Sequence, residues 1–513
     1  MGGSLLLGVD IGTSSTKGVI CTVAGEVLAS TVIEHDTSFP RPGWAEHDAD
    51  DLWWHDVVAV TRELTSGRYS GADIGAVGVS GIGPCMLPID AAGRPLRPGI
   101  LYGIDTRASA EIDQLHDVLG VEAILDLSGM ALNSQTIGPK ILWHRRREPD
   151  LFARTAKIHA SSSYVVYRLT GEHVIDRHTA SYFAPLYNRT TGDWDARYAD
   201  HVIGLDRLPR IGDATDVAGG VTTAASAETG LPVGTPVVFG TIDAAAEAVS
   251  VGIRHPGDMM IMYGSTMFFI NTVAEPQPDA RMWTTAHALP NLRAVTAGLQ
   301  TGGMLTTWFL DVTAGKARLA EHRQTFETLI ETASATPPGA EGLICLPYFQ
   351  GERTPLQDPD ARGAYVGLSL RHTTAHLFRA LLEGTAFGAR HNFEVMGEMG
   401  ASPQRLVAVG GGTKNPLWLQ VISDVTGLPQ QVPSQTIGAS YGDAFMAGLG
   451  AGLIPDLDAI DREWVQIERT VEPNPANRAI YDELYGMFLE LYPRNVDILH
   501  RLAAMNGGGA GEA

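Results

Sequence analysis

The chain has few cysteines and lacks a long apolar run. Its 513 residues include only three cysteines, Cys21, Cys85 and Cys345. Because they are odd in number and far apart, they fit neither a disulfide framework nor a zinc site, which favours a reducing cytoplasm. No apolar stretch reaches the ~18 residues of a membrane-spanning helix, and the N-terminus lacks the basic and apolar regions of a secretion signal. The sequence therefore predicts a cytoplasmic protein with no membrane partner.

Basic residues are also scarce relative to acidic ones. The sequence has 37 lysines and arginines against 58 aspartates and glutamates, which gives a formal net charge of −21. This surplus disfavours a nucleic-acid partner, because nucleic acids carry negative charge themselves. A phosphate-bearing ligand would need local positive potential from backbone N–H groups, helix N-termini, a magnesium ion or a few placed bases.

What the chain does have is length and an alternation of strand and helix patterns. So long a chain exceeds what one core usually serves, and two large domains are expected. We predict strands at residues 5–35, 74–80, 237–240, 258–272, 293–298, 343–346 and 406–409, and helices at 51–66, 107–118, 136–149, 302–314, 322–333, 373–399 and 414–426. This mixture predicts an α/β fold of two layered domains.

The domain boundary is predicted near Gly252. The expected organisation is an N-terminal domain at residues 1–252, a C-terminal domain at 253–505 and a tail at 506–513. The tail is rich in glycine and carries no apolar anchor, so it should be disordered.

Residues 10–17 carry the strongest local signal. Their sequence, Asp-Ile-Gly-Thr-Ser-Ser-Thr-Lys, lies between two apolar runs, as expected for two strands joined by a tight loop. The N–H groups and hydroxyls of such a loop suit a phosphate, and Asp10 can approach a phosphate only with a divalent cation between them. A surface hairpin with capping hydroxyls would give the same pattern. The candidate phosphate-binding residues are Thr13, Ser14, Ser15 and Lys17.

Residues 257–270 repeat this layout in the second half of the chain. An apolar run leads to Gly264, Ser265 and Thr266, and a second apolar run follows. The repeat predicts two similar domains, each offering a hydroxyl-bearing loop to the same phosphates. Two unrelated hairpins are the alternative.

Asp243 is the leading candidate for a catalytic residue. It follows the predicted buried strand at 237–240, and a helix rich in alanine begins directly after it. A carboxylate at this place is a common helix cap. The functional alternative is a general base that takes the proton from a substrate hydroxyl as the oxygen attacks the γ-phosphorus.

Glycines before two predicted helices allow a ligand to approach the backbone closely. Gly411 and Gly412 lie in a run of three glycines, and Asn415 is placed to hydrogen-bond a nucleotide. Gly303 opens the helix predicted at 302–314 and would border the base, although a plain strand-to-helix turn explains it equally well. The glycine spacing differs from the dinucleotide fingerprint, which disfavours a Rossmann dehydrogenase.

Residues 102–107 offer the mixture of groups that a sugar site needs. Tyr102 supplies an aromatic ring, Asp105 an acceptor and Arg107 donors. A helix start with a paired aspartate and arginine is the alternative.

Several longer segments match the signatures of a known family. Residues 363–383 fit its second signature at every constrained position, and residues 139–143 fit part of its first, with Ile137 where Pro, Ser or Thr is expected. Further matches lie at residues 42–46, 347–355 and 410–415. On these segments the chain resembles the FGGY family of carbohydrate kinases over nearly its whole length.

The resemblance implies two actin-like, ribonuclease-H-like domains that close over ATP and a sugar or polyol, so that water is excluded. It implies that Asp243 is the base and that Asp10 orients Mg²⁺ through water. Thr13 and Ser265 would hold the β- and γ-phosphates. The residues implied to flank the nucleotide are Gly303, Gly411 and Asn415. A homodimer is left open.

Within the family, the likeness to xylulokinases is nearest, from residues 176–195 and 347–355. Two positions differ. Pro84, after Gly83, stands where xylulokinases carry a histidine that contacts the sugar, and Ala244 stands where they carry asparagine. Proline has no side-chain donor, so the usual xylulose contact is missing.

The leading hypothesis is therefore an ATP-dependent kinase of a small sugar hydroxyl, with a ketopentose such as D-xylulose as substrate. Gluconate, ribulose or a polyol stays open. An actin- or chaperone-like switch ATPase is the rival from another class, but no peptide-binding or polymerisation module is visible. A catalytically silent sugar sensor would need neither Asp10 nor Asp243.

Overall fold

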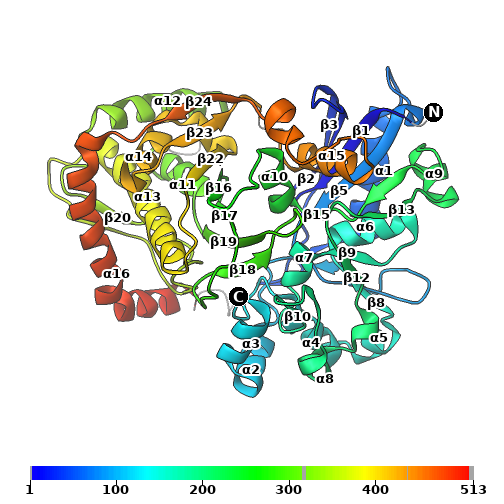
Figure 1. Cartoon of the computed structure of the whole chain (residues 1–513). Coiled ribbons are helices and arrows are strands. Elements are labelled where there is room, and N and C mark those ends of the chain that lie inside the picture. Colours follow the sequence, from blue (N-terminus) through cyan, green and yellow to red (C-terminus); the bar gives the residue numbers. More distant parts are fainter. Residues whose placement is uncertain (1–2, 315–318, 436, 508–513) are drawn as a thin grey trace. The chain divides into compact units, whose positions relative to one another are not determined.

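A mixed β-sheet forms the centre of the first half of the chain (Figure 1). The computed structural model describes residues 3–314, 319–435 and 437–507. The strands run in the order β13-β14-β5-β1-β2-β3, and β15 also pairs with β5. Their bounds are β1 Leu5–Ile11, β2 Ser15–Thr22, β3 Val27–Glu34, β5 Ile74–Gly81, β13 Val217–Gly220, β14 Pro236–Val238 and β15 Thr241–Ile242.

Two helices distant in sequence, α1 (His55–Leu64) and α15 (Ala439–Gly450), cover opposite faces of this sheet. A Cβ atom on Gly18, which pairs with Val9, would lie 2.2 Å from Cγ1 of Val60 in α1. A Cβ atom on Gly8 would lie 1.8 Å from the carbonyl oxygen of Ser440 in α15. Successive residues of a strand face opposite sides, so α1 and α15 lie on opposite faces.

Glycines let α15 lie directly against the sheet and against α10 (Asp243–Ser250). Gly78 is the β5 partner of Gly8, and a Cβ atom on it would lie 2.1 Å from the carbonyl oxygen of Asp443. A Cβ atom on Gly442 would lie 2.0 Å from the carbonyl oxygen of Ala246 in α10. A side chain at these positions would therefore push α15 away.

A second sheet has its strands in the order β19-β17-β16-β22-β23-β24. The bounds are β16 Asp258–Tyr263, β17 Met267–Val273, β19 Arg293–Leu299, β22 Arg405–Val409, β23 Gln430–Pro433 and β24 Ile467–Val471. The helices and the small two-stranded sheet of this half are α11 Gly303–Ala314, α12 Leu319–Ala335, α13 Thr374–Glu398, α14 Pro416–Thr426, α16 Arg478–Gly507, β20 Ile344–Leu346 and β21 Ala364–Val366.

The two sheets share one connection pattern at their centres. Strand β1 is antiparallel to β2 and parallel to β5, and β16 is antiparallel to β17 and parallel to β22. Both predicted hairpins are confirmed, and so is the predicted α/β class.

The chain divides into two compact units. The first consists of Met1–Arg254, Pro278–Ala294 and Ile437–Gln466, and the second of His255–Gln277, Val295–Thr436 and Ile467–Ala513. Helix α15 thus belongs to the first unit despite its late position in the sequence.

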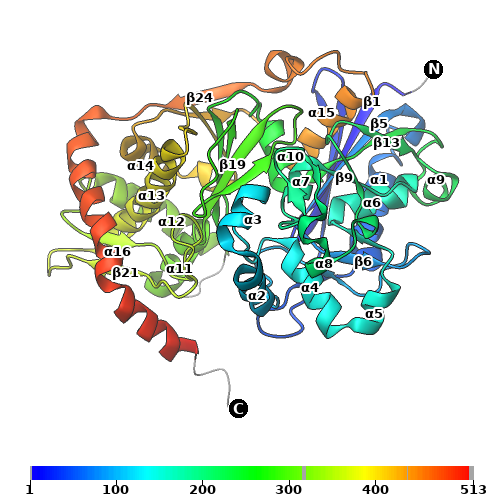
Figure 2. The ribbon, with the colours of Figure 1, turned by 60° about the horizontal axis from the view of Figure 1, so that its bottom comes forward.

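The first unit also contains many short elements. Helices α2, α3, α4, α5 and α8 pack on one another (Figure 2). The helices are α2 Ser109–Leu119, α3 Val121–Ser128, α4 Ile137–Arg147, α5 Pro149–Arg154, α6 Ser161–Thr170, α7 Arg177–Ser181, α8 Ala199–Val202 and α9 Thr223–Thr229. The strands are β4 Glu46–His47, β6 Leu87–Ile89, β7 Gly99–Ile100, β8 Lys157–His159, β9 Val174–Asp176, β10 Tyr187–Asn188, β11 Asp193–Trp194, β12 Arg210–Gly212 and β18 Trp283–Ala286.

Some local expectations need correction. The strand predicted at 237–240 is split into β14 and β15, and Asp243 is the first residue of α10 and not part of a preceding loop. Helix α16 continues to Gly507, and residues 508–513 of the predicted tail lie outside the described residues. Within the described ranges, no helix combines the length and apolarity needed to cross a bilayer.

We predict that Gly8→Ala destabilises the first unit by about 1–3 kcal/mol, because the methyl group overlaps the backbone of α15. Thermal and denaturant unfolding measure the change. Gly67→Ala is the matched control, since a Cβ atom there has no atom within 4 Å. Equal stability of the two variants would show that α15 does not lie against β1 as described.

Candidate active site

Asp10 lies near the end of β1, with its side chain on the face that α15 covers. Its register partners are Lys17 on β2 and Ser80 on β5. The Ser80 hydroxyl lies 3.1 Å from Oδ1 of Asp10, and only 6% of Asp10 is exposed. Burial raises the pKa of Asp10, whereas the charge of Lys17 and the hydrogen bond from Ser80 lower it. The carboxyl is therefore held in a fixed position.

Asp243 occupies the N-terminus of α10 near Asp10. Its Oδ1 accepts a hydrogen bond of 2.8 Å from the N–H of Ala244. Burial raises the pKa of Asp243 well above its ordinary value, and the charge of Asp10 raises it further. A carboxylate with a raised pKa is a stronger base than an exposed one, which suits proton abstraction from an alcohol.

Glu247 is a third acidic group in this cluster, and the sequence analysis did not single it out. It lies one turn after Asp243 on α10, and its side chain is half-buried. Burial and the charge of Asp10 raise the pKa of Glu247 to about 7. The i, i+4 spacing from Asp243 could have indicated it, since such residues share one helix face.

The segment at Gly83 and Pro84 lies next to the strand that leads to Asp243. A Cβ atom on Gly83 would lie 2.2 Å from Cγ2 of Ile242. Burial raises the pKa of the Cys85 thiol. The charge of Lys140 lowers this pKa and the charges of Asp243 and Asp105 raise it, so these groups lie near Cys85. The predicted sugar-binding residues therefore share one neighbourhood with Asp243.

Asp105 has its oxygens occupied by protein donors. They accept from the guanidinium of Arg107, at 2.6–3.0 Å, and from the N–H of Ala45, at 2.7 Å. None of the Asp105 side chain is exposed. In this structure Asp105 therefore offers no free acceptor to a sugar, and it fixes the loop at Ala45 and Arg107.

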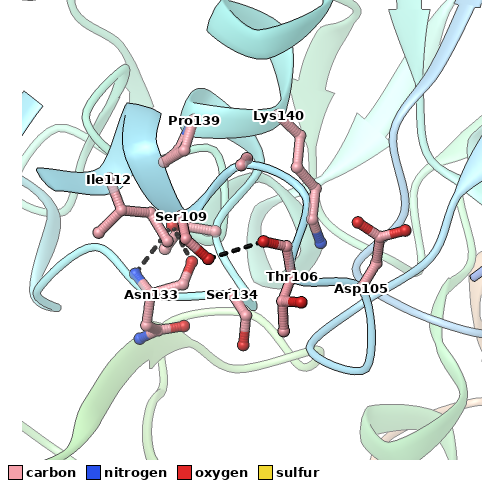
Figure 3. A pocket seen from close by; sticks show the side chains of 10 residues that line it. Asp105, Thr106, Ser109, Ile112, Asn133, Ser134, Pro139 and Lys140 are labelled. Atoms are coloured by element: carbon pink, nitrogen blue, oxygen red, sulfur yellow. Dashed lines mark hydrogen bonds between the residues drawn. The ribbon is translucent and has the colours of Figure 1, made fainter. Parts of the chain in front are cut away.

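Lys140 lies beside Asp105 at a small pocket (Figure 3). It also supports the backbone that carries Tyr102. Its ammonium donates to the carbonyl oxygens of Leu101, at 2.7 Å, and Tyr102, at 3.2 Å. Burial lowers the pKa of Lys140 to about 8, against the charge of Asp105. The predicted family signature at 139–143 thus supplies a buried lysine that positions Tyr102.

The predicted phosphate loop of the first unit is a tight turn. The N–H of Gly12 donates to the carbonyl of Ser15, and the carbonyl of Thr13 accepts from Thr37. Ser14 and Lys17 are exposed, whereas Thr13 and Ser15 are half-buried. The hydroxyls are therefore within reach of a ligand.

The second unit contains a pocket of about 740 Å³, a size typical of ligand sites. Six predicted nucleotide-binding residues line it together: Gly264, Ser265, Gly303, Gly411, Gly412 and Asn415. The exposed Ser265 lies between β16 and β17, and its carbonyl accepts from the N–H groups of Gly302 and Met304. A Cβ atom on Gly303 would lie 2.8 Å from the carbonyl oxygen of Gly264, so glycine keeps this turn against α11.

Asn415 both caps a helix and faces the pocket. Its Oδ1 accepts from the N–H groups of Leu417, at 3.1 Å, and Trp418, at 3.2 Å, at the start of α14. Its Nδ2 is buried and has no hydrogen-bond partner among the described residues. That amide is therefore available to a ligand. Trp418, at the start of α14, is buried.

The acidic cluster fits a magnesium ion held mainly through water. Asp10 raises the pKa of both Asp243 and Glu247, so a cation would relieve the repulsion among these groups. Among the described residues, no three His, Cys, Asp or Glu side chains form a group that could hold a metal ion. Mg²⁺ in phosphoryl-transfer sites typically keeps several waters and binds one or two carboxylates and the substrate phosphates.

The fold is that of a sugar kinase, and the comparisons with known proteins define the family. Residues 5–250 match the N-terminal domain of the FGGY family of carbohydrate kinases, and residues 259–451 match its C-terminal domain. The chain belongs to this family and has its two-domain, actin-like and ribonuclease-H-like fold.

Three relatives illustrate the similarity. The crystal structure of xylulose kinase from Rhodospirillum rubrum is 34% identical, with a TM-score of 0.90, over 97% of this chain and all of that chain. The autoinducer-2 kinase of Klebsiella pneumoniae is 30% identical over 95% of this chain and 94% of its own length. The xylulose kinase of Lactococcus lactis is 28% identical over 98% of this chain and 99% of its own length.

The observed helix cap and the predicted nucleotide contact of Asn415 are separable. Asp caps a helix as well as Asn, so Asn415→Asp should keep the stability of the second unit. It removes the amide donor and adds a negative charge beside the pocket, so we expect ADP to bind at least about tenfold more weakly. Isothermal titration calorimetry and thermal unfolding measure the two effects.

Asn415→Ala is the matched variant. It should weaken ADP binding and also cost about 1 kcal/mol of stability, because the cap is lost. Unchanged ADP affinity in Asn415→Asp would remove Asn415 from the nucleotide site.

Proposed function

We propose that this carbohydrate kinase transfers the γ-phosphoryl group of ATP to a hydroxyl of a small ketose, with Asp243 as the general base. The observation that carries the proposal is the environment of Asp243, a half-buried carboxyl whose pKa is raised by burial and by the charge of Asp10. A base of raised pKa can accept the proton that the attacking hydroxyl loses. The N–H of Ala244 donates to Oδ1 of Asp243 and holds the carboxyl at the start of α10.

The second unit would bind the nucleotide in the pocket that Ser265, Gly303 and Asn415 line. The backbone around Ser265 suits the phosphates, and Trp308, which lines the same pocket and is 40% exposed, offers a ring to the base. Mg²⁺ would neutralise charge that develops on the phosphates. Asp10 would hold it through water, and Thr13 would hydrogen-bond a phosphate oxygen.

The sugar is proposed to bind in the first unit, beside Gly83, Pro84 and Tyr102. A ketopentose such as D-xylulose is supported by the names of relatives, which are mostly xylulose kinases. Pro84 and Ala244 can donate no side-chain hydrogen bond, so a substrate that needs two such contacts would bind weakly. We therefore expect a small ketose whose oxygen atoms are arranged differently from those of D-xylulose. Relatives named autoinducer-2 kinase support a substrate other than xylulose.

A substrate panel tests the proposed function. ADP release is measured with D-xylulose, ribulose, autoinducer-2, gluconate, glycerol and no acceptor, and the product is identified by mass spectrometry. One small ketose should give the highest kcat/KM, and release without acceptor should be far slower. Equal ADP release with and without every acceptor would indicate a switch ATPase and contradict the proposal.

We predict that Asp243→Asn lowers kcat by about 10²-fold or more and leaves the Kd of the sugar nearly unchanged, because only the proton acceptor is lost. In the parent, kcat/KM should rise with pH through the raised pKa of Asp243, since the carboxylate is the active form. Steady-state kinetics across pH and calorimetry with the sugar are the measurements.

The exposed Asp193→Asn variant is the control for a lost carboxylate, and it should behave as the parent. An Asp243→Asn variant that keeps parental turnover and the parental pH profile would exclude Asp243 as the base.

A further inference from the structure

Behind Asp10 lies an acidic group that the proposed reaction does not use. Asp443 is carried by α15 and is completely buried. Its Oδ2 lies 2.6 Å from the hydroxyl of Ser80, and the same hydroxyl lies 3.1 Å from Oδ1 of Asp10. One serine therefore lies between two carboxyl groups.

The single hydroxyl proton of Ser80 limits which of the two carboxyl groups can accept a hydrogen bond from it. A serine hydroxyl has one proton to donate and two lone pairs to accept. It cannot donate well to two carboxylates at once, and two ionised groups facing one buried oxygen would repel each other. One of the two carboxyl groups must therefore hold a proton and donate it to Ser80.

The surroundings select Asp443 as that group. Burial raises the pKa of Asp10 as well, but the charge of Lys17 opposes this rise. The Oδ1 of Asp443 has no hydrogen-bond partner among the described residues. Burial raises the pKa of Asp443 well above its ordinary value, the charges of Asp10 and Asp243 raise it further, and hydrogen bonds from Ser80 lower it.

We propose that Asp443 is a positioning residue that stays protonated, donates to Oγ of Ser80 and thereby directs the Ser80 proton to Asp10. The chain of hydrogen bonds runs from Asp443 through Ser80 to Oδ1 of Asp10. It fixes the orientation of Asp10 for its proposed role at the magnesium ion, so the inference rests on the proposed function in that respect. An ionised Asp443 would draw the Ser80 proton to itself and leave Asp10 without it.

The backbone of the first unit is built for this contact. Gly8 and Gly78 are two residues before Asp10 and Ser80 on the same strands, and therefore face the same side of the sheet. Their lack of side chains is what lets α15 approach closely enough for Asp443 to reach Ser80.

Infrared difference spectroscopy tests the protonation directly. The spectrum of Asp443→Asn is subtracted from that of the parent in D₂O at neutral pH, without ligands. Asn has the size of Asp, is neutral and can donate its amide to Ser80, so the fold should persist. The carbonyl stretch of a protonated carboxylic acid should appear in the difference. The stretches of a carboxylate in its place would overturn the proposal.

The magnesium dependence of ADP binding tests the hydrogen-bond relay from Asp443 through Ser80 to Asp10. Ser80→Ala should need about tenfold more Mg²⁺ for half-maximal ADP affinity, because a hydrogen bond to a charged group is lost. Asp443→Asn should stay within about threefold of the parent, since it preserves the donor. Ser128→Ala is the control: Ser128 is also fully buried in the first unit, but it donates to the carbonyl of Tyr187 and not to a carboxylate.

Ser80→Ala and Ser128→Ala should lose similar thermal stability. A difference in their magnesium dependence would therefore come from the hydrogen bonds of Ser80 and not from a general loss of stability. Equal magnesium dependence in the two variants, or a tenfold loss in Asp443→Asn, would overturn the proposal. None of these measurements needs a sugar, so their outcome does not depend on the result of the substrate panel. Failure of the panel with a protonated Asp443 would refute the proposed function alone.

Discussion

The close approach of α15 to β1 and β5 is the constraint on which the candidate site depends. Gly8, Gly78 and Gly442 remove the side chains that would separate the helix from the sheet and from α10. At the distances observed, even a methyl group would overlap a backbone carbonyl. Close packing of this kind transmits small displacements, because interiors contain few voids. The positions of Asp10, Ser80 and Asp243 therefore depend on a helix encoded hundreds of residues later.

Burial of several acids beside this contact sets the chemistry. Removal from water disfavours the charged form of each carboxyl, and each charge opposes the next. The groups proposed to stay neutral, to hold a cation and to accept a proton differ in their partners. Asp443 faces the charges of Asp10 and Asp243, Asp10 faces the charge of Lys17, and Asp243 lies half-buried at a helix N-terminus. The same residue type is thus proposed to serve three purposes within one cluster.

Sequence reasoning succeeded where the signal is local. Both hairpins and most of the strands and helices follow from runs of neighbouring residues. Such runs also contain the residues that line the pocket of the second unit, for example those around Ser265. It missed what depends on distant contacts. No pattern in the sequence predicted α15 or placed Asp443 next to Ser80, since these residues are separated by most of the chain. For Asp105 the sequence left a sugar contact and a pairing with Arg107 open. The structure shows the pairing with Arg107, and the added hydrogen bond from the distant Ala45 had no signal in the sequence.

The central claim is that buried carboxyl groups around Asp10 require a cation when they are ionised. The most direct measurement is a titration of the ADP complex with Mn²⁺, followed by electron paramagnetic resonance, in the parent and in Asp10→Ala. The account predicts clearly weaker metal binding in the variant, because an oxygen-rich anion that suits a hard cation has been removed. Identical titration curves for the two proteins would contradict it.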